Sequence, residues 1–130
     1  MKPTTHAGEF PLGRAHHRMD QHIGPIRAIT PFTATSGEGK AAKDFGKLLP
    51  VLEHLSKAPD YLHPDQREPV KALSEDILEK IASPGFKKPS ATQLSDVSKR
   101  LVELHRRLQE SNEYYMFRVY DGQYRKKLRP

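Results

Sequence analysis

The strongest hydrophobic pattern lies in the last third of the chain. From Leu94 onward, apolar residues recur at alternating spacings of three and four positions. The series is Leu94, Val97, Leu101, Leu104, Leu108, Ser111 and Tyr115, and Ser111 is its one polar member. Such a seam predicts a long helix that buries a narrow stripe. Ser90 and Gln93 precede it at the spacing of a capping box, so we expect the helix to begin there.

Two shorter stripes lie upstream. The first consists of Ala41, Phe45, Leu48, Leu52 and Leu55, and the second of Val70, Leu73, Ile77 and Ile81. Pro50 interrupts the first stripe and predicts either a kink near Leu48 or a helix that starts at Pro50 itself. We expect the second helix to start near Pro64 or Pro69, because proline is tolerated in a first helical turn. Segment 57–66 is then a loop, and "SPGFKKPS" ends the second helix.

These three amphipathic helices have short connections and would bury their stripes against one another. The sequence therefore predicts an all-α fold, namely a small three-helix bundle. An antiparallel hairpin and one long C-terminal helix would form it. We expect an arm at 1–40, a helical domain at 41–120 and a basic tail at 121–130.

The N-terminal segment shows no comparable period. Proline stands at positions 3, 11, 25 and 31, and glycine at 8, 13, 24, 37 and 39. These residues predict an extended or disordered arm, because the segment alone buries too little apolar surface to offset its conformational entropy. We expect the arm to contact a partner through its scattered apolar side chains. These are Phe10, Ile23, Ile26, Ile29 and Phe32.

The end of the chain, "YYMFRVYDGQYRKKLRP", combines aromatic and basic residues around Asp121-Gly122. Asp-Gly is typical of a two-residue hairpin turn, but glycine also commonly follows a helix end. Because Tyr115 and Val119 continue the helical spacing, we favour a helix that reaches about Tyr120 and stops at this pair. The remaining residues would form a short basic tail.

The charge pattern makes this tail the best candidate for a contact with a partner. The formal charge of the chain is +6, of which 116–130 carry +4, 1–40 carry +2 and 41–115 carry none. Basic residues next to aromatic ones suit an acidic protein surface or a nucleic acid. The expected contact residues are Arg118, Tyr124, Arg125, Lys126, Lys127 and Arg129. Alternatively, Tyr115, Phe117 and Val119 complete the core and the basic residues are only solvated.

Candidate catalytic chemistry is sparse. The 130 residues include no cysteine, which excludes thiolate nucleophiles and thiolate metal sites. Four histidines surround Asp20 without the spacing of a closed ligand set, and we interpret them as a solvated group. They are His6, His16, His17 and His22. We therefore expect no enzyme, no metal and no other cofactor.

The sequence is most consistent with a non-enzymatic helical interaction protein. We expect an accessory subunit or assembly factor that docks on another protein or a multi-subunit complex through the arm and the tail. One alternative is a nucleic-acid-binding protein that adds Arg100, Arg106 and Arg107 to the basic aromatic C-terminus. Another is a secreted bacterial effector or inhibitor with a disordered export segment. The long seam would also permit self-association.

The sequence gives only weak signals for where in the cell the protein is located. No run approaches the roughly 20 apolar residues that a membrane-spanning helix requires. The lack of cysteine fits a reducing compartment. We therefore favour a soluble, cytoplasmic protein.

Overall fold

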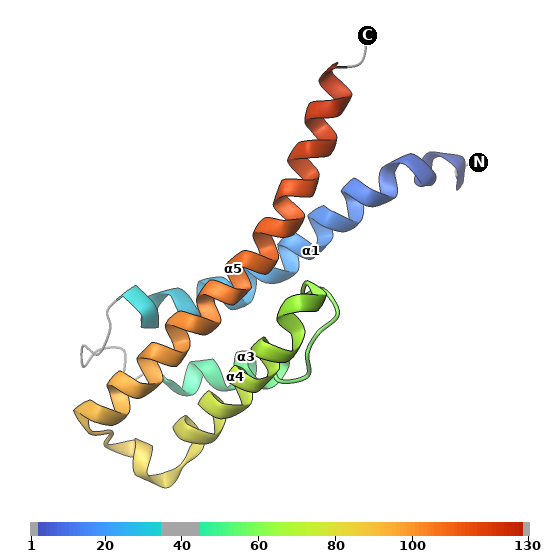
Figure 1. Cartoon of the computed structure of the whole chain (residues 1–130). Coiled ribbons are helices and arrows are strands. Elements are labelled where there is room, and N and C mark those ends of the chain that lie inside the picture. Colours follow the sequence, from blue (N-terminus) through green and yellow to red (C-terminus); the bar gives the residue numbers. More distant parts are fainter. Residues whose placement is uncertain (1–2, 35–44, 129–130) are drawn as a thin grey trace.

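The computed structural model describes residues 3–34 and 45–128, with side chains described for 15–33 and 45–119. Within these residues the chain is helical and contains no strand, which confirms the all-α class. The long helices are α1 (Pro3–Ala34), α4 (Pro64–Ala82) and α5 (Ala91–Leu128). The shorter elements are α3 (Leu49–Leu55) and the 3₁₀ turns η1 (Phe45–Leu48) and η2 (Pro84–Lys87). Figure 1 shows α1 and α5 crossing each other, with α3 and α4 beside them.

Residues 3–34 form helix α1, so the prediction of an extended arm is wrong. On α1, His22 contacts Ser111 of α5. Thr30, further along α1, contacts His105, which comes earlier in α5. The two helices therefore run antiparallel, and α1 is a fourth helix beside the three that were predicted.

Packing against the rest of the molecule explains why α1 is helical despite its prolines. Ile29 is fully buried and Phe32 nearly so, and both lie in the main core. Burying one side chain of this size stabilises the fold by about 2 kcal/mol. Ala15 and His22 of α1 are buried as well. The physical reason for the error is thus a tertiary contact that the local sequence does not contain.

Two prolines of the middle segment, Pro50 and Pro64, act as helix starts, in agreement with the sequence, whereas Pro69 lies inside α4. Pro50 lies in the first turn of α3, which confirms one of the two predicted alternatives. Pro64 begins α4, where the ring Nδ1 of His63 accepts a hydrogen bond from the Asp65 N–H at 3.2 Å. This bond satisfies one of the free N–H groups at the helix N-terminus. The segment after α4 forms η2, as expected of a helix end.

Helix α5 begins at the predicted capping box. The Ser90 Oγ accepts from the Gln93 N–H at 3.2 Å, and the Gln93 Oε1 accepts from the Ser90 N–H at 2.8 Å. The helix then continues to Leu128, so the predicted stop at Asp121-Gly122 is wrong. One glycine costs a helix only about 1 kcal/mol relative to alanine, and the residues after it include strong helix formers.

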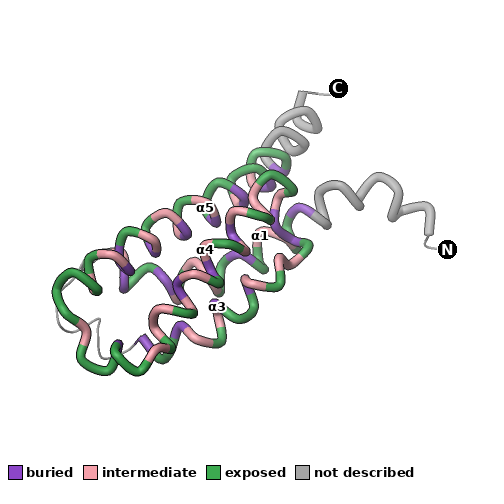
Figure 2. The backbone as a smooth tube through the Cα atoms, turned by 60° about the horizontal axis from the view of Figure 1, so that its bottom comes forward, coloured by how far each residue is buried: buried purple, intermediate pink, exposed green. Residues whose placement is uncertain are grey.

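One core is shared by the helices of the described ranges. Its buried apolar residues are Ile29, Phe32, Phe45, Leu48, Leu52, Leu55, Tyr61, Leu62, Val70, Ile77, Phe86, Val97, Leu101, Leu104 and Leu108. A smaller cluster of Ala15, Tyr115 and Val119 joins α1 to α5 near the end where both helices extend past α4. Figure 2 shows the buried positions following the inner side of each helix. Because α1 contributes to both clusters, it belongs to the bundle.

Candidate interaction site

A buried polar junction lies where α1 crosses α5. The His22 Nε2 is 2.7 Å from the Ser111 Oγ, and the His22 Nδ1 is 2.6 Å from the carbonyl oxygen of Arg18. The Ser111 Oγ also accepts a hydrogen bond from the backbone N–H of His63 at 2.8 Å. One tautomer satisfies every atom: Nδ1–H donates to the carbonyl, and Nε2 accepts from the serine hydroxyl. The junction therefore links α1, α5 and the start of α4.

The surroundings keep His22 neutral. Burial lowers the pKa of His22, and the nearby Arg18 charge acts in the same direction, whereas the hydrogen bond to the Arg18 carbonyl opposes them. The rings of Tyr61 and Tyr115 lie 4.9 and 6.0 Å from the imidazole, centroid to centroid. Burial also raises the pKa of Tyr61 to about 12. Both groups are thus uncharged near neutral pH.

The junction has the atoms of a serine–histidine pair, and its geometry gives it a structural role. Both His22 and Ser111 are 0% exposed, so a substrate cannot approach the hydroxyl. The second ring nitrogen faces a backbone carbonyl, where a catalytic triad has a carboxylate. We interpret the pair as a polar contact that holds two helices together.

The sequence-based interpretation of His22 as solvated is wrong. His16 and His17 are exposed, as expected, whereas the side chain of His6 lies outside the described residues. A usable signal exists in the chain, because one series in α1 has spacings of four, three, four and three. That series is Ala15, Met19, His22, Ile26 and Ile29. Its single polar member matches the single polar member of the α5 seam.

Two arginines fasten the loop between α3 and α4 next to this junction. The Arg18 Nη1 and the Arg67 Nη2 both donate to the carbonyl oxygen of Asp60, the latter at 3.0 Å. The Arg18 guanidinium carbon also lies 5.6 Å from the centroid of the Tyr115 ring, within cation–π range. Arg18 therefore connects α1 with the loop and with α5.

The five predicted arm contacts do not form one surface. Ile29 and Phe32 are core residues, so their assignment to a partner surface is wrong. Ile26 is partly buried and packs against the same core. Ile23 is 38% exposed and remains accessible, whereas Phe10 lies outside the described side chains. The disordered conformation expected for an export segment is wrong for residues 3–34, which form α1.

Among the predicted basic contacts, Arg118 is described and exposed. Its Nη1 donates to the Tyr114 hydroxyl at 3.1 Å, and its guanidinium carbon lies 5.8 Å from the centroid of that ring. The other predicted contacts lie outside the described side chains. They are Tyr124, Arg125, Lys126, Lys127 and Arg129.

Two exposed aromatic residues, Tyr114 and Phe117, lie near Arg118 on α5, and we call these three residues the aromatic patch. Phe117 is 71% exposed and Tyr114 is 40% exposed. The Tyr114 ring packs edge-on against His63 with 4.2 Å between centroids, which fixes the patch relative to the start of α4. The sequence does not reveal the exposure of Phe117, because its position next to the seam is equally consistent with burial.

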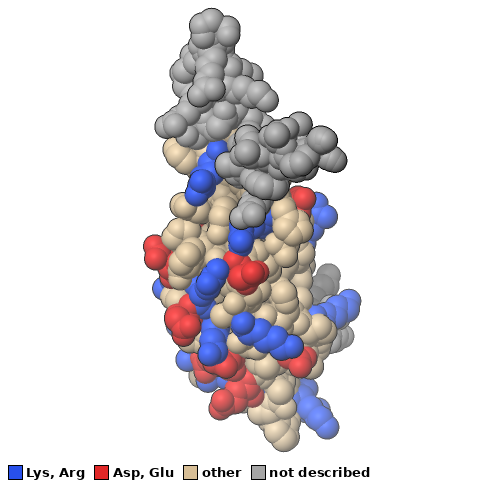
Figure 3. Space-filling view, turned by 90° about the vertical axis from the view of Figure 1, so that its right-hand side faces the viewer, with Lys and Arg blue, Asp and Glu red and all other residues tan. Residues whose placement is uncertain are grey.

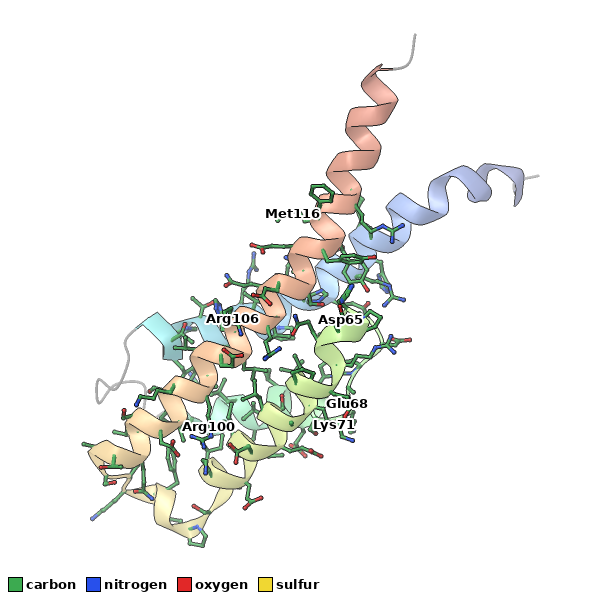
Figure 4. The ribbon with its side chains drawn as sticks, in the orientation of Figure 1. Asp65, Glu68, Lys71, Arg100, Arg106 and Met116 are labelled. Carbon is green, nitrogen blue, oxygen red and sulfur yellow. The ribbon has the colours of Figure 1, made fainter. Side chains whose placement is uncertain are left out.

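The arginines in the first part of α5 are engaged in ion pairs. Arg100 pairs with Asp76 and Asp96, and these hydrogen bonds raise the pKa of Arg100 further. Arg106 and Arg107 both reach Glu103, at 2.6 and 2.8 Å. Figure 4 labels Arg100 and Arg106 along α5, with Met116 further toward its C-terminal end. The positive charges of these three arginines are therefore balanced by acidic side chains of the same chain.

The helical body carries mixed charge. In Figure 3, basic and acidic side chains alternate over the visible face. In the described part of the chain, no group of three or more histidine, aspartate and glutamate side chains is placed to hold a metal ion. None of the helices in that part combines the length and the apolar character needed to cross a membrane.

The geometry thus leaves the aromatic patch on α5 as the candidate site. No family model, curated protein or solved structure matches the chain.

Proposed function

We propose that the protein is a non-enzymatic interaction protein, an accessory subunit or assembly factor, that docks on a larger complex through the C-terminal half of α5. The observation that carries the proposal is the 71% exposure of Phe117 beside Arg118. These residues open a segment, 116–130, that holds five basic residues and one acidic residue. The partner surface is then an apolar pocket with an acidic rim.

The composition of the aromatic patch supports this proposal. Tyrosine and arginine are enriched among the residues that dominate binding energy in protein interfaces. Burying a phenylalanine side chain contributes about 2 kcal/mol. Tyr114 and Arg118 hold each other through a hydrogen bond, which reduces the side-chain entropy lost on binding. Basic residues around such an anchor accelerate association with an acidic partner.

Affinity purification of the tagged protein tests the proposal. Phe117→Ala should abolish recovery of the partner from a lysate treated with nuclease. The matched control is Val102→Ala, because Val102 is an exposed apolar residue on the same helix, at 49% exposure, outside the aromatic patch. Both variants should unfold at the wild-type temperature. Full recovery of the partner by Phe117→Ala would overturn the proposal.

Nucleic-acid binding through the same segment is the second candidate. The contact between the Arg118 guanidinium and the exposed Tyr114 ring favours it, because an arginine and an aromatic ring can together bind a base. The ion pairs of Arg100, Arg106 and Arg107 reduce the positive surface that α5 could add. A binding titration with random RNA and DNA between about 50 and 200 mM salt tests this function. Binding through phosphate contacts should lose affinity steeply over that range. Undetectable binding at the lower salt concentration would exclude this function.

A further inference from the structure

Helix α1 contains two adjacent residues that weaken a helix. Gly24 and Pro25 both lie inside the helix. Pro25 has no N–H, so the helical hydrogen bond from this position to the carbonyl of Gln21 is missing. A side chain at position 24 would meet no neighbouring atom within 4 Å, so packing does not require a glycine there. The pair therefore marks a point at which α1 can bend.

The two halves of α1 on either side of this pair pack against different parts of the molecule. On the C-terminal side, Ile29 and Phe32 lie in the main core. On the N-terminal side, Ala15 belongs to the small cluster with Tyr115 and Val119 of α5. Because the two clusters share no residue, the N-terminal half can leave α5 while the C-terminal half stays in place.

Two polar contacts fasten the N-terminal half, and we call residues 15–22 the latch. The Nε2 of His22 accepts from the hydroxyl of Ser111, and Arg18 donates to the carbonyl of Asp60 in the loop before α4. The first contact requires a free lone pair on the Nε2, because the Nδ1–H of the same ring faces the Arg18 carbonyl. A second proton on the imidazole occupies that lone pair and removes the acceptor.

The surroundings of His22 do not stabilise a charged imidazole. The titratable and charged side chains of the network around it, from α1, the loop, α4 and α5, are Arg18, Tyr61, His63, Arg67 and Tyr115. The arginines are cations, and the phenols carry no charge near neutral pH. Asp65, the acidic partner of the His63 ring at 3.7 Å, is exposed to solvent. Burial and the charge of Arg18 lower the pKa of His22, so this residue binds a proton more readily once the latch is open.

We propose that the latch swings away from α5 about Gly24-Pro25 when the buried imidazole takes up a second proton. This movement uncovers Tyr115 and Val119, which are 9% and 3% exposed in the closed molecule. The Tyr115 ring lies 4.9 Å from the ring of Tyr114, centroid to centroid, so the uncovered surface adjoins the aromatic patch. The opening itself requires no partner, whereas its use to regulate binding rests on the function proposed for the aromatic patch.

Hydrogen exchange of the full chain, followed by mass spectrometry at about pH 7.5 and about pH 5.5, tests the opening. A released imidazole has a pKa of about 6.5, so protonation at the lower pH favours the open state by up to about tenfold. The amides of 15–22 should lose protection by up to that factor, after correction for the intrinsic pH dependence of exchange. The amides of 26–33 should keep their protection. Equal loss in both segments, or no loss in 15–22, would overturn the proposal.

His22→Gln removes the titrating group and should make the protection of 15–22 the same at both pH values. The matched control is His105→Gln, because His105 contacts Thr30 in the C-terminal half of α1, and this variant should keep the wild-type pH dependence. A pH dependence that persists in His22→Gln would contradict the role of the imidazole.

Gly24→Ala tests the hinge, because alanine strengthens the helix at the point where the halves meet. Protection of 15–22 should rise several-fold at both pH values. Gly46→Ala in η1 is the matched control, since a side chain there also meets no atom within 4 Å, and it should leave exchange in 15–22 unchanged. Wild-type exchange in Gly24→Ala would show that this position is not the hinge.

The uncovered apolar surface can be detected with the dye anilinonaphthalene sulfonate, which fluoresces on exposed hydrophobic surface. Its fluorescence with the wild-type chain should rise from about pH 7.5 to about pH 5.5, and the rise should be absent with His22→Gln. A wild-type chain without this rise would show that Tyr115 and Val119 stay covered, against the proposal. Exchange and dye binding use no partner, so their failure is distinguishable from a failure of the aromatic patch to recover one.

Discussion

The pair formed by His22 and Ser111 decides, at the scale of single residues, how α1 meets α5. Each is the polar member of a stripe that is otherwise apolar or small, and the antiparallel arrangement brings the two together at 2.7 Å. Any other alignment of the helices would place an imidazole or a hydroxyl against apolar groups. A polar residue at a seam position fixes register in this way.

Replacing Ser111 by alanine should lower the free energy of unfolding by about 2 to 4 kcal/mol. The His63 N–H and the His22 Nε2 would then both lack a partner in the interior, and each unsatisfied group is destabilising by about 1 to 3 kcal/mol. Chemical denaturation followed by circular dichroism measures the loss. Ser95→Ala, at an exposed position of the same helix, is the control and should change stability by less than about 0.5 kcal/mol. Equal losses of stability in Ser111→Ala and Ser95→Ala would contradict the role of Ser111 in the junction.

The stability of the protein should decrease as the pH falls through about 6.5. The pKa of His22 is lowered in the folded state, so the unfolded state binds more protons in this range. Burial also lowers the pKa of His105, which acts in the same direction. The midpoint of thermal unfolding between about pH 7.5 and 5 measures the effect.

The matched variants for this measurement are His22→Gln and His105→Gln. The slope of stability against pH should become smaller in His22→Gln, because the protonation that favours the unfolded chain is removed. His105→Gln should change the slope less, because His105 is only partly buried whereas His22 is 0% exposed. An unchanged slope in His22→Gln would show that this residue does not control the acid sensitivity.

At the scale of elements, α1 contains residues that oppose its conformation. Pro25 lies inside the helix and removes one backbone donor. Pro25→Ala should therefore stabilise the protein by about 1 to 3 kcal/mol, since alanine restores the N–H and removes the clash with the preceding turn. The control is Pro50→Ala, in the first turn of α3, where proline is tolerated and little change is expected. If this segment were a disordered arm, Pro25→Ala would not stabilise the protein. An unchanged free energy of unfolding in this variant would therefore count against a helical α1.

The elements that sequence analysis predicted correctly depend on local signals. Ser90 and Gln93 mark the start of α5, and Pro50 and Pro64 mark the starts of α3 and α4. Helix α1 depends on partners such as Ser111, which lies 89 positions from His22. A local pattern cannot contain such a contact, and the prolines obscured the stripe that was present.

The features of the candidate site also differ in whether the sequence alone could predict them. The basic aromatic segment was proposed from its composition and stays a prediction, because all its expected contact side chains except that of Arg118 lie outside the described ones. The exposure of Phe117 and the burial of Ile29 could not be predicted, because both depend on where α1 and α4 lie relative to α5.

At the scale of the whole molecule, α1 is part of the only large core of the described ranges. Ile29 and Phe32 belong to the same cluster as Leu101 and Leu104. A chain that starts at residue 41, which sequence analysis treats as an independent helical domain, should therefore fail to unfold cooperatively. The measurement is thermal unfolding followed by near-ultraviolet circular dichroism, compared with the full chain.

Adding a peptide of residues 1–40 to that fragment gives the complementary result. The peptide restores the buried surface of α1, so it should bind the fragment and recover a cooperative transition. Ile29→Ala in the peptide should weaken this recovery, whereas Ile23→Ala should not, because Ile23 is 38% exposed. A fragment that folds cooperatively without the peptide would show that α1 is dispensable.

The hydrogen bond between His22 and Ser111 also constrains how this sequence can diverge. A change of His22 alone to an apolar residue leaves the Ser111 hydroxyl proton without an acceptor, and a change of Ser111 alone leaves both the His22 Nε2 and the His63 N–H unpaired. Each single step is harmful, and a joint change to apolar residues still leaves the His63 N–H without its acceptor. In the descendants of this chain, we therefore expect position 111 to keep a hydrogen-bond acceptor and position 22 to keep a group that pairs with it.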